Sequence, residues 1–130
     1  MVLPNLGDPA PYSPNELGKL IKYVPVKDKD VLNLWYVLPY YEKMHKTQPL
    51  RYFSSLIGHE GENSLLSYLK EEDLALELCT SSDHEMSSFS VFEIQITLSA
   101  KGLENYEDVI EAVMKYIQNL RTAGPQQYFF

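Results

Sequence analysis

The sequence predicts an α+β fold, in which an antiparallel sheet carries helices packed on one of its faces. Two observations predict it. Segments with apolar residues at every second position, or almost without interruption, are typical of strands, whereas apolar residues that recur every three or four positions are typical of helices. Both kinds of segment occur in this sequence, and together they predict the element order β-β-α-α-β-β-α. The 130 residues, of which 45% are hydrophobic and 22% charged, suffice for one domain with its own core.

The first two strands are expected at residues 18–26 and 31–39. In the first, the side chains alternate and Pro25 lies near the end, which suits an edge position. The second is nearly continuous in apolar residues and contains Trp35, which favours a central strand. Because a charged turn, residues 27–30, separates them, we expect the two to pair as a hairpin.

Two short helices are expected next. Pro49 is favourable at a first helical position, and apolar residues then recur at helical spacing, which predicts a helix over residues 49–59. Asn63 or Ser64 is expected to cap a second helix that runs to Glu72.

The second half of the chain predicts two further strands and a long helix. Residues 74–82 form a strand that is expected at an edge of the sheet, because a polar loop, residues 83–88, follows it. Residues 89–99 alternate, with a change of phase near Val91 and Phe92 that predicts either a bulge or a fully buried start of the strand. A single long helix is then expected to begin between Ser99 and Gly102 and to end at about residue 121, before Gly124 and Pro125.

The charge and the cysteine count exclude several classes of function. With 11 Lys and Arg against 18 Asp and Glu, the formal charge is −7, which disfavours nucleic acid and favours a basic peptide. The single Cys79 excludes an internal disulfide and is expected to be a small buried residue in a strand. One cysteine and no signal-like start predict a reducing compartment, the cytoplasm, and no apolar run is long enough to span a membrane.

No set of residues in the sequence predicts catalysis or a cofactor. The three histidines, His45, His59 and His84, lack the second histidine that a helical zinc-protease motif requires. No nucleophile-elbow, phosphate-loop or dinucleotide motif occurs either. We therefore expect no catalytic residue, no metal ligand and no cofactor in this chain.

Three segments have both an ordinary and a functional interpretation. The segment from Gly58 to Gly61, with sequence GHEG, is a tight turn between helices, or it places a carboxylate at a helix end where an ammonium group could be received. The acidic cluster at residues 71–73 is a solvated helix end, or it attracts a basic peptide. The aromatic residues Trp35, Tyr36, Tyr40 and Tyr41 pack in the core and hairpin, or they form a platform for stacking, and the negative charge of the chain favours packing.

The stretch LRYFSSLIGHEG at residues 50–61, which continues into SLLSYL at residues 64–69, resembles the second domain of the insulinase (pitrilysin) family of zinc metallopeptidases. The similarity begins near Leu20 and reaches Gln126, about 110 of the 130 residues. The family's zinc motif, H-x-x-E-H, belongs to a different domain, so the resemblance implies a non-catalytic domain, with zinc held elsewhere in a larger peptidase.

The resemblance also implies a peptide-binding exosite that holds the N-terminus of a substrate. On this chain it comprises a loop, Gly58, Glu60 and Gly61, and a receiving strand, Leu78, Cys79 and Thr80. In this region the sequence departs from the family pattern at two places. Ser55 replaces a histidine, and Thr80 with Ser81 replaces a pair of glycines that would allow close backbone approach.

The composition thus predicts an extended lead-in at residues 1–17, and the resemblance implies a partial insulinase-like domain at residues 18–130. The expected function is to position peptide substrates for a zinc metalloendopeptidase, with peptides and the remaining domains of the peptidase as partners. A structural or interaction domain of a catalytically inactive relative, and a free-standing regulatory module, are the alternatives. Phe129 and Phe130 are expected to promote self-association of the fragment.

Overall fold

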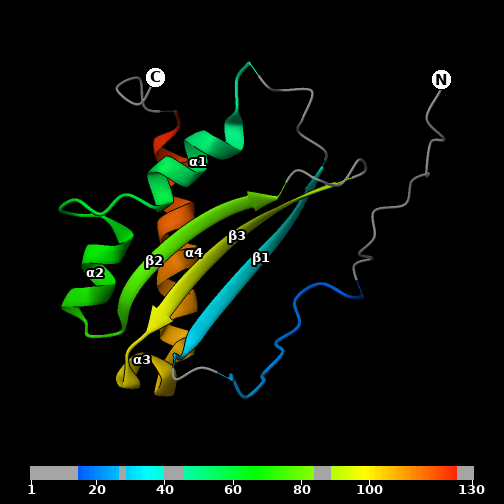
Figure 1. The fold of residues 1–130 in the computed structure, drawn as a ribbon. Helices are drawn as coiled ribbons and strands as arrows, with labels where there is room; N and C mark the ends of the chain where they lie inside the picture. The colour runs from blue at the N-terminus through cyan, green and yellow to red at the C-terminus, as the bar shows by residue number, and fades with distance from the viewer. Residues whose placement is uncertain (1–14, 27–28, 40–45, 84–88, 126–130) are drawn as a thin grey trace.

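The computed structural model describes residues 15–26, 29–39, 46–83 and 89–125. Their elements follow the chain as β1 (Val31–Pro39), α1 (Pro49–Ile57), α2 (Leu65–Glu71), β2 (Ala75–Asp83), β3 (Phe89–Leu98), α3 (Ala100–Glu104) and α4 (Tyr106–Ala123), as Figure 1 shows. The expected lead-in at residues 1–14, His45, His84, Tyr40, Tyr41, and Phe129 with Phe130 lie outside the described residues.

The sheet is antiparallel and has the strand order β1-β3-β2, so β3 lies at its centre. Alternate side chains of β3 are buried, from Ser90 to Leu98, because one face of the strand meets the helices. Strand β1 pairs with β3 from Val31 opposite Thr97 to Pro39 opposite Phe89. Strand β2 is an edge of the described sheet, as the sequence predicts. Strand β1 is its other edge, so the central position expected for residues 31–39 was wrong.

The helices cover one face of this sheet, so the predicted α+β fold is confirmed. Figure 1 shows α4 running behind the strands, with α1 and α2 beside β2. The N-cap of α2 is Ser64, whose hydroxyl accepts a hydrogen bond from the Ser67 amide at 3.1 Å. The core joins apolar residues of the sheet to those of the helices, including Leu69, Ile94 and Val113. Among the described helices, α4 is the longest, and none has the length and apolarity needed to cross a membrane.

The opposite face of the sheet is open and carries hydrogen bonds between neighbouring strands. Trp35 Nε1 donates to Glu93 Oε1 at 2.8 Å, and the Ser81 hydroxyl donates to Glu93 Oε2 at 3.2 Å. Trp35 is 67% exposed there, so its expected place in the core was wrong. Its neighbour Tyr36 points to the other face and packs against the core, because successive strand residues alternate.

The predicted first strand is absent. Residues 18–26 form no strand, and Ile21 and Val24 are 80% and 92% exposed. An alternating pattern indicates strand propensity, but a strand also needs a partner, and in the described sheet β1 pairs with β3 alone. One contact that this segment does make is between Lys22 Nζ and the Tyr106 ring, 4.4 Å from its centroid. The observed order is therefore β-α-α-β-β-α-α.

The predicted long helix is two helices, separated at Asn105. Gly102 of α3 packs directly on the Leu74 backbone, which fixes α3 across the end of the sheet. Asn105 then leaves the helical conformation, with φ −115° and ψ 38°, and its side-chain amide donates to the Lys101 carbonyl at 2.8 Å. The last helix ends at Ala123, before Gly124, as the sequence predicts.

The predicted bulge near Val91 is also absent, because β3 keeps its register with β1 through that point. The change of phase in the apolar pattern arises because the small polar Ser90 occupies a buried position. The register shift lies in β2 instead, between Ala75 and Glu77.

Candidate peptide-binding site

The last turn of α1 lies against β2, and Gly58 is the residue at that approach. Its amide donates to the Ser54 carbonyl at 2.8 Å and so ends the helix. A Cβ at position 58 would lie 2.9 Å from that carbonyl oxygen and 3.3 Å from the Thr80 hydroxyl. Because the first distance is shorter than ordinary carbon–oxygen contacts, a larger residue at position 58 would force the end of α1 to shift.

Two hydroxyl groups connect α1 to β2. The Ser54 and Thr80 hydroxyl oxygens lie 2.5 Å apart, and the Thr80 hydroxyl also lies 3.3 Å from the Ser54 carbonyl oxygen. On its other side, α1 is held by the Tyr116 hydroxyl, which donates to the Leu56 carbonyl at 3.3 Å. The end of α1 is therefore fixed to both β2 and α4.

Beyond Gly58 the chain turns toward α2 through an acidic loop. Both His59 and Glu60 are exposed, and a Cβ on Gly61 would lie 2.5 Å from His59 Nε2, so the imidazole covers the Gly61 backbone. The Gly61 carbonyl accepts from the Ser64 amide at 3.2 Å, which completes the turn into α2. Glu60 has no hydrogen bond or ion pair among the residues that the structure describes.

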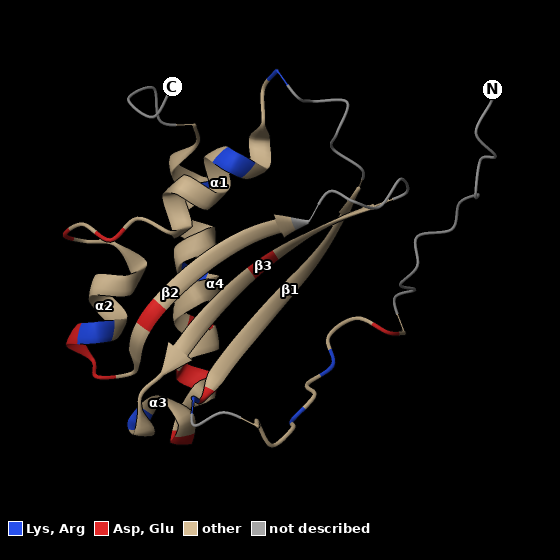
Figure 2. Ribbon diagram, in the orientation of Figure 1, with Lys and Arg blue, Asp and Glu red and all other residues tan. Residues whose placement is uncertain are grey.

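Figure 2 shows acidic positions at both ends of α2, in the loop before it and in the turn after it. The loop contains Glu60 and Glu62, and residues 58–64 include no Lys or Arg. The turn contains the acidic cluster at residues 71–73, all of them exposed. The loop therefore offers unneutralised carboxylates to a positively charged group.

The three predicted strand residues differ in what they can offer. Leu78 is buried and Thr80 faces the same side, toward the helices, so only their backbone groups are available at the strand edge. Cys79 faces the open side and is exposed, so its expected burial was wrong. The reason is that β2 is covered on one face only, and Cys79 pairs with Gln95 on the uncovered face.

The structure thus brings Gly58 and Thr80 into contact, as two parts of one site. Glu60 is exposed, and among the described residues no hydrogen bond or ion pair joins it to β2. Ser54 was not among the residues predicted from the sequence, although its spacing from Leu50 and Gly58 was a signal. Ser54 lies four residues after Leu50 and four before Gly58, so these positions share one helix face.

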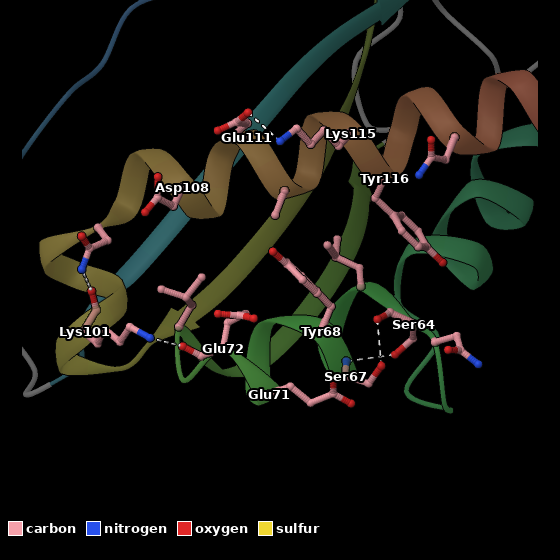
Figure 3. Close-up of a pocket in the computed structure, with 16 residues that line it drawn as sticks. Ser64, Ser67, Tyr68, Glu71, Glu72, Lys101, Asp108, Glu111, Lys115 and Tyr116 are labelled. Carbon is pink, nitrogen blue, oxygen red and sulfur yellow. Dashed lines mark hydrogen bonds and ion pairs between the residues drawn. The ribbon is translucent and has the colours of Figure 1, made fainter.

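A second concave region lies between α2 and α4, with a volume of about 750 Å³ (Figure 3). Its two lysines are engaged within it. Lys101 Nζ donates to the Glu72 carbonyl at 2.6 Å, and Lys115 Nζ lies 2.7 Å from Glu111 Oε1. The hydrogen bond from Lys115 lowers the pKa of Glu111, and the same bond raises the pKa of Lys115. No nucleophile with an adjacent base is present among the described residues that line this region.

The described residues also contain no group of three His, Cys, Asp or Glu side chains that could hold a metal ion. The donors that zinc prefers are therefore not assembled here. His59, the one described histidine, lies on Gly61 without a second histidine beside it.

The comparisons with known proteins agree with the α+β fold of the described residues. Residues 3–129 match the family described as "Peptidase M16 inactive domain". The chain belongs to this family, the inactive domain of insulinase-family metallopeptidases.

The relatives include nardilysin of Rattus norvegicus, 34% identical over 92% of this chain, and insulin-degrading enzyme of Drosophila melanogaster, 32% identical over 92%. The A-factor-processing enzyme of Saccharomyces cerevisiae is 37% identical over 90%. The chain spans only 11–12% of the length of these three relatives. Among solved structures, pitrilysin matches 82% of this chain, and 12% of its own, with a TM-score of 0.78 at 24% identity, which shows the shared fold.

Proposed function

We propose that this chain positions peptides for a zinc metalloendopeptidase by holding their N-terminal part at the edge of β2. An extended peptide adds to an exposed sheet edge through main-chain hydrogen bonds, which demand little of its sequence. The backbone of Leu78, Cys79 and Thr80 would supply these bonds. The function is one of binding, and none of its steps passes through a metal or a catalytic residue of this chain.

The observation that carries the proposal is an edge strand together with an unpaired carboxylate in the loop that leaves the helix end fixed to that strand. Strand β2 pairs only with β3 in the described sheet, and the Gly58 to Gly61 loop follows the helix turn that is fixed to β2. Glu60 in this loop has no partner among the described residues, so its carboxylate is available to a peptide's α-ammonium. Such an exposed pair contributes about 0.2–1 kcal/mol, so it orients the peptide more than it holds it.

The experiment compares two peptides of one sequence, one with a free amino terminus and one N-acetylated, by NMR titration of the 130-residue chain. We expect weak binding, with Kd values of about 10⁻⁴ M or higher, because the remaining parts of the peptidase that would add avidity are not in this chain. The amide shifts should change at Leu78, Cys79 and Thr80. Glu60→Gln should weaken the free peptide by up to about fivefold and spare the acetylated one.

The matched control is Glu104→Gln, which removes one exposed carboxylate from α3, outside the proposed site, and should change neither Kd. If Glu60→Gln weakens both peptides equally, or weakens neither, Glu60 does not receive the amino terminus. The alternative, a structural or interaction domain of a catalytically inactive relative, would then remain, and amide shifts confined to other surfaces would support it.

A further inference from the structure

We infer that Ser54, through its bond to Thr80, is a positioning residue that holds the peptide-binding loop in place beside β2. This inference rests on the proposed function and adds to it a residue that the sequence did not single out. It also revises the role of Thr80. The side chain of Thr80 faces α1 and not the strand edge, so its hydroxyl sets the position of the loop while its backbone remains available to a peptide.

The Ser54 carbonyl is the centre of this arrangement. It accepts the Gly58 amide at 2.8 Å and lies 3.3 Å from the Thr80 hydroxyl, so the bond that ends the helix and the contact with the strand share one oxygen. The second contact, between the two hydroxyl oxygens at 2.5 Å, satisfies both side chains. If the Ser54 hydroxyl donates to Thr80 and the Thr80 hydroxyl donates to the carbonyl, each proton has an acceptor.

These contacts fix the residue from which the acidic loop departs. Gly58 lies against both partners, and a Cβ there would meet the Ser54 carbonyl and the Thr80 hydroxyl. The chain therefore leaves α1 at a fixed point relative to β2, with Glu60 only two residues further on. Without the hydroxyl contacts, the last turn of α1 would lose this link to the strand, and the carboxylate would sample more positions relative to a bound peptide.

Both groups in the link are hydroxyls that stay neutral at ordinary pH, and the pair is partly buried. The link itself should therefore not change with pH between about 6 and 9, in which Ser and Thr do not titrate, but the peptide's α-amino group loses its charge near pH 8, so the two peptides are compared below about pH 7. On the opposite side of α1, the Tyr116 hydroxyl holds the Leu56 carbonyl, so loss of the Ser54 contact frees the loop without detaching the helix.

The test measures the ratio of the two Kd values, for the N-acetylated and the free peptide, in the 130-residue chain. Ser54→Ala and Thr80→Val remove the link from its two sides, and each should lower this ratio toward one, about two- to fivefold, as Glu60→Gln does. Thr80→Ser keeps a hydroxyl and should retain the ratio. Ser55→Ala is the matched control, because the Ser55 hydroxyl donates to the Arg51 carbonyl at 3.0 Å within its own helix.

A change in stability alone would alter the binding of both peptides together and leave the ratio unchanged, which separates positioning from a purely structural role. The ratio is measured only for variants whose NMR spectra show that they are folded. One folded variant, Ser54→Ala or Thr80→Val, is enough for the test. If Glu60→Gln lowers the ratio but Ser54→Ala and Thr80→Val do not, the positioning role is overturned and the proposed function stands. If Glu60→Gln leaves the ratio unchanged, the proposed function fails and this inference fails with it.

Discussion

Gly102 of α3 packs so closely on Leu74 that a Cβ at position 102 would lie 1.8 Å from the Leu74 carbonyl oxygen. That carbonyl also accepts the Ser99 amide at 3.1 Å, so it cannot move without breaking a bond at the end of the sheet. Gly102→Ala should therefore destabilise the fold by about 2–3 kcal/mol, measured by urea unfolding.

The comparison for this prediction is Gly124→Ala, at a glycine with open space around its Cβ position and a positive φ of 70°. There the cost should be only that of a backbone conformation, φ 70° and ψ −174°, that residues other than glycine rarely adopt, about 1–2 kcal/mol. Equal costs at the two positions would mean that the backbone near Leu74 adjusts to the added methyl group.

Leu69 of α2 is fully buried, with 0% of its surface exposed, and belongs to the core cluster. Leu69→Ala leaves a cavity among residues that are held by the sheet and by α4, so it should lower the free energy of unfolding by about 2–5 kcal/mol. The matched control is Leu103→Ala, because Leu103 is 46% exposed, and its effect should stay within about 0.5 kcal/mol. Similar losses for both variants would contradict the assigned core.

The sequence correctly predicts those features whose signal lies within the element itself, such as an apolar stripe or a residue at a helix end. The apolar stripe of α4 appears in the sequence as residues three and four apart, and Val109 and Val113 are buried as expected. The Ser64 cap and Gly124 at the end of α4 are likewise local signals. The break at Asn105 was not predicted, because the apolar stripe of α4 does not show where the helix begins, and the packing of Gly102 on Leu74, which places α3, joins residues far apart in the sequence.

The errors at residues 18–26, Cys79 and Trp35 have one physical cause. Alternation shows that a segment can form a strand with two unlike faces, but it does not show which neighbour pairs with it or which face is covered. Residues 18–26 have the alternating pattern, but they pair with no strand of the described sheet. Trp35 and Cys79 lie on a sheet face that is open, so residue types that are commonly buried are exposed here.

The candidate site was predictable only in part, for a similar reason. The turn at Gly58 and the edge position of β2 follow from local composition, and the resemblance to the family supplied the pairing of loop and strand. The hydroxyl link between Ser54 and Thr80 joins residues 26 positions apart, and no spacing rule connects two such small polar residues.

The chain alone should neither hydrolyse peptides nor bind zinc stoichiometrically. The sequence has no H-x-x-E-H motif, and the described residues assemble no cluster of metal-binding side chains. Metal analysis of the purified 130-residue chain, together with a peptide cleavage assay, tests both statements. A bound zinc ion at one equivalent, or cleavage that copurifies with the chain and is blocked by a chelator, would contradict this prediction.

Burial raises the pKa of Tyr36, which lies on the covered face of β1 with its hydroxyl 3.7 Å from the Met114 sulfur. The folded-state pKa is thus above the unfolded value of about 10. The resulting stabilisation is fully present below the unfolded pKa and is lost as the pH rises through the folded pKa.

Tyr36→Phe should therefore flatten the loss of stability above about pH 10, measured by urea unfolding at several pH values. Tyr23→Phe, at a ring that is 69% exposed, is the control and should follow the unaltered curve. If Tyr36→Phe keeps the full alkaline loss, ionisation of Tyr36 does not limit stability there.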